Sequence, residues 1–192
     1  MSRSSTVTRK TKETDITISL CLEGGAVTAK TGIGFFDHML TAFGFYAGFG
    51  LEIIAKGDLH VDAHHTVEDV GIVLGQALAQ ALGGKEGIVR FGTAFVPMDE
   101  SLARVVLDIS ARPYLVYDAV MPQERIGDYD SCLTQEFFRA MATHAGLTIH
   151  AAALYGANAH HMTEALFKAL GLALKQAVTV AGQGVTSTKG VL

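Results

Sequence analysis

The sequence predicts an α+β domain made of two similar halves, each with its sheet on one side and its helices on the other. The main observation is an internal repeat, in which LHVDAHHTVEDVGIVLGQALAQAL, from Leu59, aligns without gaps on YGANAHHMTEALFKALGLALKQAV, from Tyr155. Apolar residues at helical spacing inside both copies, and short apolar strands before them, support the same fold. Two copies are too few for a solenoid, so we expect one domain over 1–192, with pseudo-twofold repeats at about 10–92 and 93–185.

Each half contains its elements in the order strands, helix, strand, helix. Apolar residues three or four positions apart indicate the helix of each repeat; they are Val67, Val70, Leu74, Leu78 and Ala81 in the first copy and Met162, Leu166, Leu170, Leu174 and Ala177 in the second. We expect strands at 16–22, 51–55, 103–110 and 147–155, and a second helix per half at 35–48 and 134–146. The first ten or so residues are polar, and we expect them to fray.

Composition narrows the class of protein. A chain of 192 residues, 49% hydrophobic and 18% charged, can bury a full core and is not of the disordered type. The net charge of −4 argues against a nucleic-acid partner, and no apolar run is long enough to cross a membrane. The polar N-terminus and two cysteines, Cys21 and Cys132, predict a reduced, cytoplasmic protein. The high apolar content would suit a subunit that associates with copies of itself.

The HHxxE pattern at the start of each repeated helix is the strongest chemical signal. His64 and Glu68 lie on one face of a helix and could share a metal ion, whereas His65 points about 100° away. Adjacent imidazoles therefore serve two different ions, or one of them is idle. The second copy, with His160, His161 and Glu164, could supply the missing ligands if the halves or neighbouring subunits face each other.

A single HHxxE is more often a polar helix start whose histidine is already satisfied, but two copies at matching positions favour a metal site. The pattern is not HExxH, in which a glutamate lies between two ligands, so a metalloprotease is disfavoured. His38 follows an aspartate on the other helix of the first half and, taken alone, would be a capping or surface residue. Arg90 and Arg112, taken alone, would be surface ion-pairing groups.

Several longer motifs resemble one enzyme family over essentially the whole chain. They are TGIGFFDHML, GDLHVDAHHTVEDVGIVLGQAL, PMDESL, DISARPYL, GANAHHMTEALFKALG and the terminal STKG. The chain is similar in these segments to the imidazoleglycerol-phosphate dehydratases of histidine biosynthesis. The resemblance implies a single catalytic domain of duplicated α+β units. It also implies trimers that build a 24-subunit shell, and two manganese(II) ions per subunit bound at subunit contacts.

The resemblance assigns the metal ligands residue by residue. They fall on His38, His64, His65, Glu68, His160, His161 and Glu164, and the eighth falls on Glu136, where the family usually has a histidine. The oxygen of Glu136 would still suit a hard ion such as manganese. His144, further along the same helix, is an alternative replacement that the spacing does not demand.

The substrate residues follow in the same way. Glu13 resembles an N-terminal acidic residue that reaches the active site, and Arg90 and Arg112 match arginines on the phosphate side. Ser187, Thr188 and Lys189 match the C-terminal phosphate loop, in which Thr186 stands where the family usually has proline. Cationic and hydroxyl side chains together suit a phosphate dianion, which they bind through charge-assisted hydrogen bonds.

The implied reaction removes water from imidazoleglycerol phosphate to give imidazoleacetol phosphate. No carbonyl activates the C–H bond that must break, so the imidazole ring has to act as the electron reservoir. We expect an imidazolate that expels hydroxide to give a diazafulvene-type intermediate held between two metal ions. The ligand and proton-transfer roles are divided among Glu13, Glu68, Glu164, His65 and His161, and the sequence does not identify the base.

Two other functions share part of this pattern. A hydrolase using a metal-activated hydroxide would need the same metal and phosphate residues, but it would release phosphate. A metal-storing or structural shell would need the metal ligands without turnover. The PMDESL and STKG motifs favour an enzyme, because a storage shell has no use for a phosphate loop.

Overall fold

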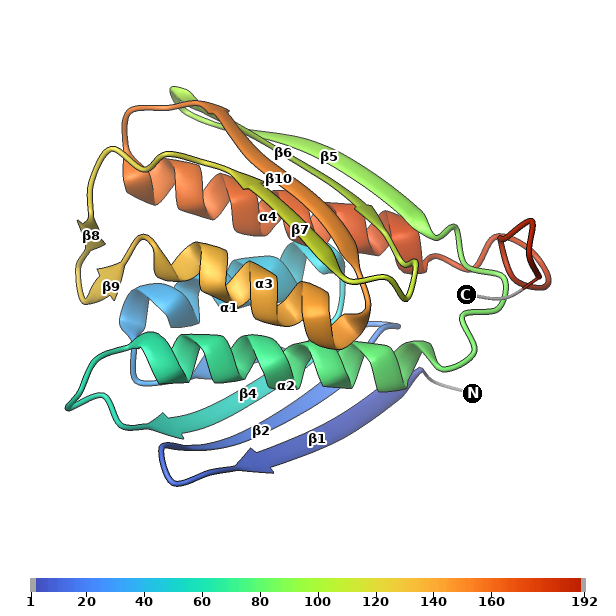
Figure 1. Ribbon diagram of the computed structural model, residues 1–192, viewed down its shortest axis with the longest axis horizontal. Coiled ribbons are helices and arrows are strands. Elements are labelled where there is room, and N and C mark those ends of the chain that lie inside the picture. The colour runs from blue at the N-terminus through green and yellow to red at the C-terminus, as the bar shows by residue number, and fades with distance from the viewer. Residues whose placement is uncertain (1–2, 191–192) are drawn as a thin grey trace.

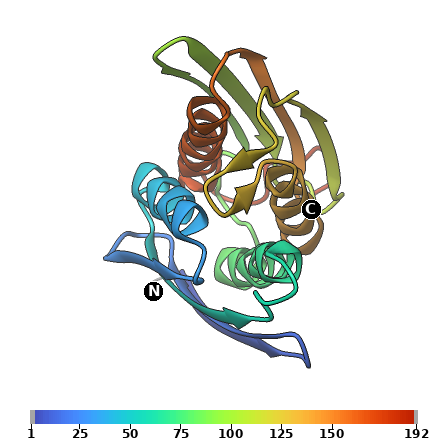
Figure 2. The same cartoon turned by 90° about the vertical axis from the view of Figure 1, so that its left-hand side faces the viewer.

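The computed structural model describes residues 3–190 and contains two four-stranded sheets on the outside with four helices between them. Each sheet carries the two helices of its own half on its inner side, and the two helix pairs meet in the middle of the molecule (Figures 1 and 2). The α+β class and the duplicated half-domain are therefore confirmed. Within residues 3–190, no helix combines the length and the apolar character needed to span a bilayer.

The two halves have the same topology. The first consists of β1 (Ser4–Lys10), β2 (Thr14–Cys21), β3 (Val27–Lys30), α1 (Gly34–Ala47), β4 (Gly50–Gly57) and α2 (His64–Leu82). The second consists of β5 (Phe91–Met98), β6 (Ser101–Asp108), β7 (Tyr114–Asp118), α3 (Leu133–Ala145), β10 (Thr148–Tyr155) and α4 (Ala159–Val178). The sheet orders are β1-β2-β4-β3 and β5-β6-β10-β7, and the last pair is parallel in both. A small hairpin, β8 (Arg125–Ile126) and β9 (Tyr129–Asp130), is inserted in the second half.

The central strands follow directly from apolar alternation. In β2, Ile16, Ile18 and Leu20 face the helices and are buried, while the residues between them face solvent. The expectation that the N-terminal segment frays is wrong for Ser4–Lys10, which pairs with β2 along its whole length, while residues 1–2 lie outside the described residues. This edge strand has one large apolar residue, Val7, and therefore almost no sequence signal. Its place is decided by the open edge that β2 offers.

Glycines set how closely the helices approach. A Cβ at Gly71 would lie 2.8 Å from the Phe137 carbonyl oxygen on α3, and one at Gly171 would lie 2.6 Å from the Phe43 carbonyl oxygen on α1. The helices α2 and α3 therefore pack backbone against backbone, and α4 and α1 do the same. This packing brings α1 beside the HHxxE motif of α4, and α3 beside that of α2.

The first turns of α2 and α4 are held alike. The Asp62 carboxylate accepts a hydrogen bond of 2.7 Å from the His64 backbone N–H, and the Asn158 side chain accepts one of 2.9 Å from that of His160. Asp62 and Asn158 are equivalent in the repeat. Asn158 is the N-cap of α4, and Asp62 lies one residue before the N-cap of α2, so both side chains bind a backbone N–H of the first helical turn and fix the backbone that carries each histidine pair.

Candidate metal centres and phosphate pocket

One preformed group of possible metal ligands joins α1 to α4. The ligand atoms of His38, His160 and Glu164 all lie within 4.8 Å of one another. Glu164 Oε2 is 3.4 Å from Nε2 of His38 and 3.1 Å from Nε2 of His160. Two imidazole nitrogens and a carboxylate oxygen suit manganese and other first-row divalent ions, so these residues fit the expected metal.

Glu164 is the electrostatic centre of this group. Its carboxylate is buried, and its Oε1 lies 2.8 Å from the ammonium group of Lys168, one helical turn further along α4. Burial acts to raise the pKa of Glu164, but Lys168, His38 and His160 outweigh it, and the net pKa is lowered. The carboxylate is therefore ionised at neutral pH, as a metal ligand must be.

The neighbouring histidine, His161, faces a different carboxylate. Its Nδ1 lies 2.7 Å from Oε2 of Glu100, in the turn between β5 and β6. This hydrogen bond raises the pKa of His161. It is also the largest cause that lowers the pKa of Glu100 to about 2, followed by the hydrogen bond from the Ala157 backbone N–H.

The first repeat is arranged similarly around its histidine pair. His64 Nε2 lies 3.7 Å from the carboxylate of Glu68, both on the exposed face of α2. His65 Nδ1 lies 3.0 Å from Asp58 Oδ2 and 3.9 Å from Glu13 Oε2. The hydrogen bond to Asp58 is the main cause that raises the pKa of His65.

Glu136 holds the position in the second half that His38 holds in the first. His38 lies ten residues before the capping Gly48 of α1, and Glu136 lies ten residues before the capping Gly146 of α3. The Glu136 carboxylate is 2.6 Å from Arg139 on its own helix. Among residues 3–190, it forms no compact ligand group with His64 and Glu68 like that around Glu164.

Within one chain, His144 is too far from His64 to stand in for the missing histidine. Its Cβ lies against Gly75, which is eleven residues beyond His64 on α2. Eleven residues of α-helix span about 16 Å, too far for one ion to be shared with His64.

The expected phosphate residues converge on one open pocket of about 620 Å³. It is lined by Arg90, Phe91, Arg112, Thr186, Ser187, Thr188 and Lys189. Arg90 forms a two-pronged pair with Asp108, at 2.6 and 3.0 Å, and also donates to the Thr186 carbonyl oxygen. The Asp108 pair is the main cause that raises the pKa of Arg90. Three cations against one carboxylate leave a positive pocket, which suits a phosphate group.

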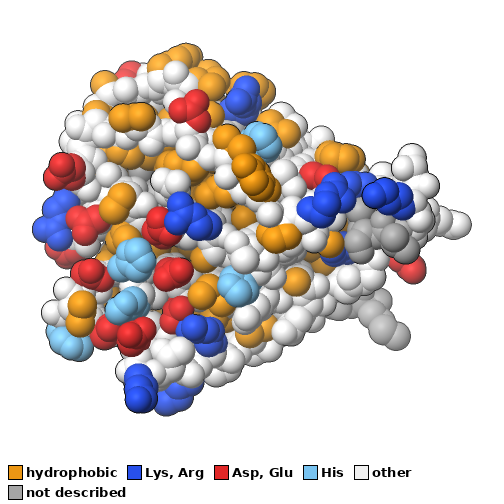
Figure 3. All heavy atoms as spheres, in the orientation of Figure 1, with side chains coloured by type: hydrophobic (Ala, Val, Ile, Leu, Met, Phe, Trp, Pro, Cys, Tyr) orange, Lys and Arg blue, Asp and Glu red, His pale blue; other side chains and the backbone are white. Residues whose placement is uncertain are grey.

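The candidate phosphate pocket and the candidate ligand group of His38, His160 and Glu164 lie at opposite ends of α4. The Arg90 backbone N–H bonds to the Ala177 carbonyl oxygen at the end of α4, whereas His160 is at its start. The separation of 17 residues corresponds to about 26 Å of α-helix. In Figure 3, several histidines gather among acidic side chains at the left, and a group of lysines and arginines lies at the right. A small substrate cannot bridge both within one chain.

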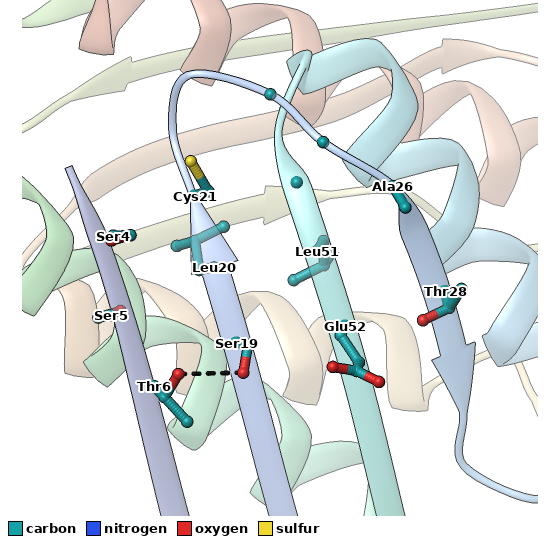
Figure 4. Close-up of a pocket in the computed structure, with 13 residues that line it drawn as sticks. Ser4, Ser5, Thr6, Ser19, Leu20, Cys21, Ala26, Thr28, Leu51 and Glu52 are labelled. Atoms are coloured by element: carbon teal, nitrogen blue, oxygen red, sulfur yellow. Dashed lines mark hydrogen bonds between the residues drawn. The ribbon is translucent and has the colours of Figure 1, made fainter. Parts of the chain in front are cut away.

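Another surface hollow belongs to neither site. It is a trough of about 700 Å³ on the outer face of the first sheet, lined mainly by hydroxyl side chains and glycine backbone (Figure 4). Thr6 and Ser19 hydrogen-bond to each other across it, and Glu52 is its one charged residue. It contains no cation, so it is unsuited to a phosphate.

Three residues near the histidine pairs were missed by reasoning from the sequence. Lys168 lies four positions after Glu164, a spacing that places both on one helix face and could have revealed it. Glu100 is part of PMDESL, a motif noted without a role. Asp58 is part of GDLHVDAHH, a motif also noted without a role for this residue, and only the fold brings it to His65.

Comparisons with known proteins identify the family of the chain. The family model for imidazoleglycerol-phosphate dehydratase matches residues 31–174. The chain is 56% identical to the imidazoleglycerol-phosphate dehydratase of Acetivibrio thermocellus, covering 100% of both chains, and 56% identical to that of Lacticaseibacillus casei, covering 99% of this chain and 100% of the relative.

Two crystal structures of the same kind of enzyme superpose closely. The Staphylococcus aureus structure has a TM-score of 0.85 at 43% identity and covers 93% of this chain and 99% of its own. The Pyrococcus furiosus structure has a TM-score of 0.86 at 44% identity, with 97% and 100% covered. Fold and relatives together define a carbon–oxygen lyase of the hydro-lyase class. The chain belongs to the imidazoleglycerol-phosphate dehydratase family, which acts in histidine biosynthesis.

Proposed function

We propose that the enzyme dehydrates imidazoleglycerol phosphate with two manganese(II) ions per subunit, at active sites that neighbouring subunits complete. The observation that carries this proposal is the geometry of α4. Its first turn holds a preformed ligand group, and its far end lies beside the phosphate pocket, about 26 Å away. Since one substrate cannot span that distance, the metal end of one subunit and the phosphate end of another must face each other.

The proposed roles of the residues follow from their surroundings. His38, His64, His65, Glu68, His160, His161 and Glu164 would hold the ions, which when bound supply Lewis acidity to the substrate imidazole. Glu136 would join them only after leaving Arg139. Arg90, Arg112, Ser187, Thr188 and Lys189 would bind the phosphate.

The proton-transfer role is assigned to the glutamate whose carboxylate is most exposed and least engaged with other side chains. The Glu13 side chain is 56% exposed and lies beside His65 without a close hydrogen bond to it, so its carboxylate is free to exchange protons with a substrate. Glu164 is committed to Lys168 and two histidines, which makes it a ligand rather than a base. Glu68, on an exposed helix face, remains available for either role.

The bonding changes balance without any further reactant. Loss of the ring N–H proton gives an imidazolate, whose electrons expel hydroxide from the adjacent carbon and form a diazafulvene. Removal of the proton from the next carbon, with return of a proton to the ring, gives an enol. The enol tautomerises to the ketone imidazoleacetol phosphate. Hydroxide and the proton that is not returned leave as water.

Self-association is supported by the outer face of the second sheet. Phe91, Phe95 and Tyr114 are exposed there by 52%, 56% and 65%. Apolar residues gathered on one face favour burial against another protein surface. We propose that this burial contributes to the trimers and the 24-subunit shell that the family resemblance implies. The cytoplasmic location stays a prediction from the two cysteines and the polar N-terminus.

The first test is metal analysis of the purified protein together with turnover of imidazoleglycerol phosphate, before and after chelation. We expect about two manganese-type ions per chain, and activity that is lost on chelation and restored by manganese. Turnover that persists at full rate in the chelated, metal-free protein would refute the metal dependence.

Subunit sharing is tested by mixing two inactive variants, His160→Ala and Lys189→Ala, and reassembling them together. If each site combines one metal end with one phosphate end, random mixing leaves about one quarter of the sites with both ends intact. Activity should therefore rise from near zero to at most about one quarter of the native value. Each variant reassembled alone is the control, and a mixture that stays inactive would contradict sharing.

A further inference from the structure

Both carboxylate oxygens of Glu100 take part in hydrogen bonds. Its Oε1 accepts hydrogen bonds from the backbone N–H groups of Ala157 and Asn158, at 3.1 and 2.9 Å, and from the Ser101 hydroxyl at 2.9 Å. Its Oε2 faces His161 Nδ1 at 2.7 Å. Oε1 therefore anchors the carboxylate to the loop before α4, and Oε2 faces the imidazole of His161 in the first turn of this helix.

The first half achieves the same contact from a different place in the chain. Glu13 and Glu100 are equivalent in the two halves, because each immediately precedes the second strand of its sheet. Yet Glu13 stays 3.9 Å from His65 Nδ1, and Asp58, at the end of β4, approaches that nitrogen to 3.0 Å instead. A carboxylate thus forms a hydrogen bond with Nδ1 of both histidines, although the two carboxylates come from residues that are not equivalent in the sequence repeat.

An ionised carboxylate can only accept a hydrogen bond, so Nδ1 of each histidine must be the donor. In a neutral imidazole, a protonated Nδ1 leaves the lone pair on Nε2. The contact therefore selects Nε2 as the nitrogen that can bind a metal; in His161 the nearest recorded acidic group to Nε2 is the exposed Asp99 carboxylate at 3.7 Å, beyond hydrogen-bond distance. A carboxylate behind a ligating histidine also fixes the ring's orientation and raises its basicity as a ligand.

We propose that Asp58 and Glu100 are positioning residues that keep Nδ1 of His65 and His161 protonated and so present Nε2 of each ring to a metal ion. The inference rests on the proposed metal-dependent function and deepens it. It also explains why Glu13 is free: Asp58 has taken over the task that the equivalent Glu100 performs in the second half. The first-half glutamate is thereby left exposed for proton transfer.

The decisive variant is Glu100→Gln. A glutamine keeps an oxygen for the Ala157 and Asn158 N–H groups but turns an NH₂ donor toward His161. The ring must then accept at Nδ1 and carry its proton on Nε2, the nitrogen meant for the metal. Two quantities are measured on the full chain: the His161 tautomer, by nitrogen NMR of the metal-free, histidine-labelled protein, and the dissociation constant for manganese, by equilibrium dialysis.

We expect Glu100→Gln to move the proton to Nε2 and to weaken manganese binding by about 10- to 100-fold. Asp58→Asn should do the same at His65. Asn158→Ala is the structural control: it removes the side-chain cap of α4 but keeps the backbone N–H that Glu100 accepts, so it should lower Tm while the His161 proton stays on Nδ1. Glu52→Gln removes one exposed negative charge from the outer face of the first sheet, and it should change neither the His161 tautomer nor the dissociation constant for manganese.

The outcomes separate this inference from the proposed function. If the native chain binds manganese and Glu100→Gln binds it equally well, or keeps its proton on Nδ1, the positioning role is wrong while the metal site stands. If the native chain binds no manganese, the proposed function fails and the positioning role fails with it. Loss of binding in Glu100→Gln with an unchanged Tm supports the proposal.

Discussion

The two halves share a fold but differ in how far each assembles its metal ligands. In one group, His38 from α1 meets His160 and Glu164 from α4 within 4.8 Å. In the counterpart group, Glu136 replaces the α1-type histidine and pairs with Arg139, while His64 and Glu68 remain exposed. Equivalent helices thus give one preformed group and one open group. Under the proposed function, the open group would depend more heavily on a neighbouring subunit to complete it.

A difference in nearby charged residues explains much of the contrast between the preformed and the open ligand group. Lys168 holds Glu164 in place in the preformed group, whereas the equivalent position in the first repeat is Ile72. Without an ammonium group beside it, Glu68 is free to turn toward solvent or toward another chain. A duplicated motif therefore does not imply duplicated sites, because the residues around it have diverged.

The largest expected effect distinguishes the two groups directly. His160→Ala removes the central imidazole of the preformed group, and we expect the manganese affinity of that site to fall by at least about 100-fold. His64→Ala should weaken the other site and leave the first one intact. Metal content and affinity are compared by dialysis with elemental analysis. Equal losses at both sites in both variants would mean that the two groups act as one unit.

Helix packing gives the next contrast, at the equivalent glycines Gly171 and Gly75. An added Cβ would lie 2.6 Å from the Phe43 carbonyl oxygen in Gly171→Ala and 2.9 Å from that of Met141 in Gly75→Ala. Overpacking of this kind costs about 1–3 kcal/mol of unfolding free energy, and Gly171→Ala should cost more.

Urea unfolding of the metal-free protein measures the difference between these glycine variants. Gly34→Ala serves as the control, because its Cβ would meet nothing within 4 Å. A Gly171→Ala variant as stable as Gly34→Ala would show that the helices can separate at no cost.

A smaller change should make the halves more alike. Glu136→His restores an imidazole at the position equivalent to His38, and we expect tighter manganese binding at the open group by about 10-fold. Arg139→Gln is the companion variant: it frees Glu136 from an exposed ion pair whose loss should alter stability by about 1 kcal/mol or less. If Glu136→His weakens binding instead, the glutamate oxygen is itself a ligand in the assembled protein.

The smallest effect concerns the pH dependence of stability. Glu100 has a folded-state pKa of about 2, below the ordinary 4.5, so its contribution is present above pH 4.5 and is lost as the pH falls toward 2. His161 has a raised pKa, so its contribution is present below pH 6.5 and is lost as the pH rises through the folded-state value. Their pair therefore stabilises the metal-free protein most between about pH 4.5 and 6.5.

Thermal unfolding across pH tests this window, because the acid side of the curve should be shallower for Glu100→Gln than for the native chain. Parallel curves for the two proteins would show that the pair contributes nothing measurable.

Elements and residues with a clear local sequence pattern could be predicted from the sequence, and those without one could not. The central strands and all four helices were predicted, since apolar periodicity over eight or more residues records which face is buried. The edge strands β1, β3, β5 and β7 were not, because the neighbouring strand decides their pairing. Likewise, the histidine motifs stood out as repeats, whereas Asp58 became relevant only when β4 brought it to His65.

By itself, the sequence determined the duplicated α+β fold, both HHxxE helices and the family, and through the family resemblance it pointed to the residues that line the proposed phosphate pocket. These properties follow from local sequence patterns and from motif identity, so they can be inferred without knowing which residues are in contact. Only the tertiary structure decided that one ligand group is preformed and the other open, that Glu100 and Asp58 hold the histidine rings, and that the phosphate pocket lies a helix length from the metal ligands. Those facts depend on distances between segments far apart in the chain, which packing sets and local sequence does not record.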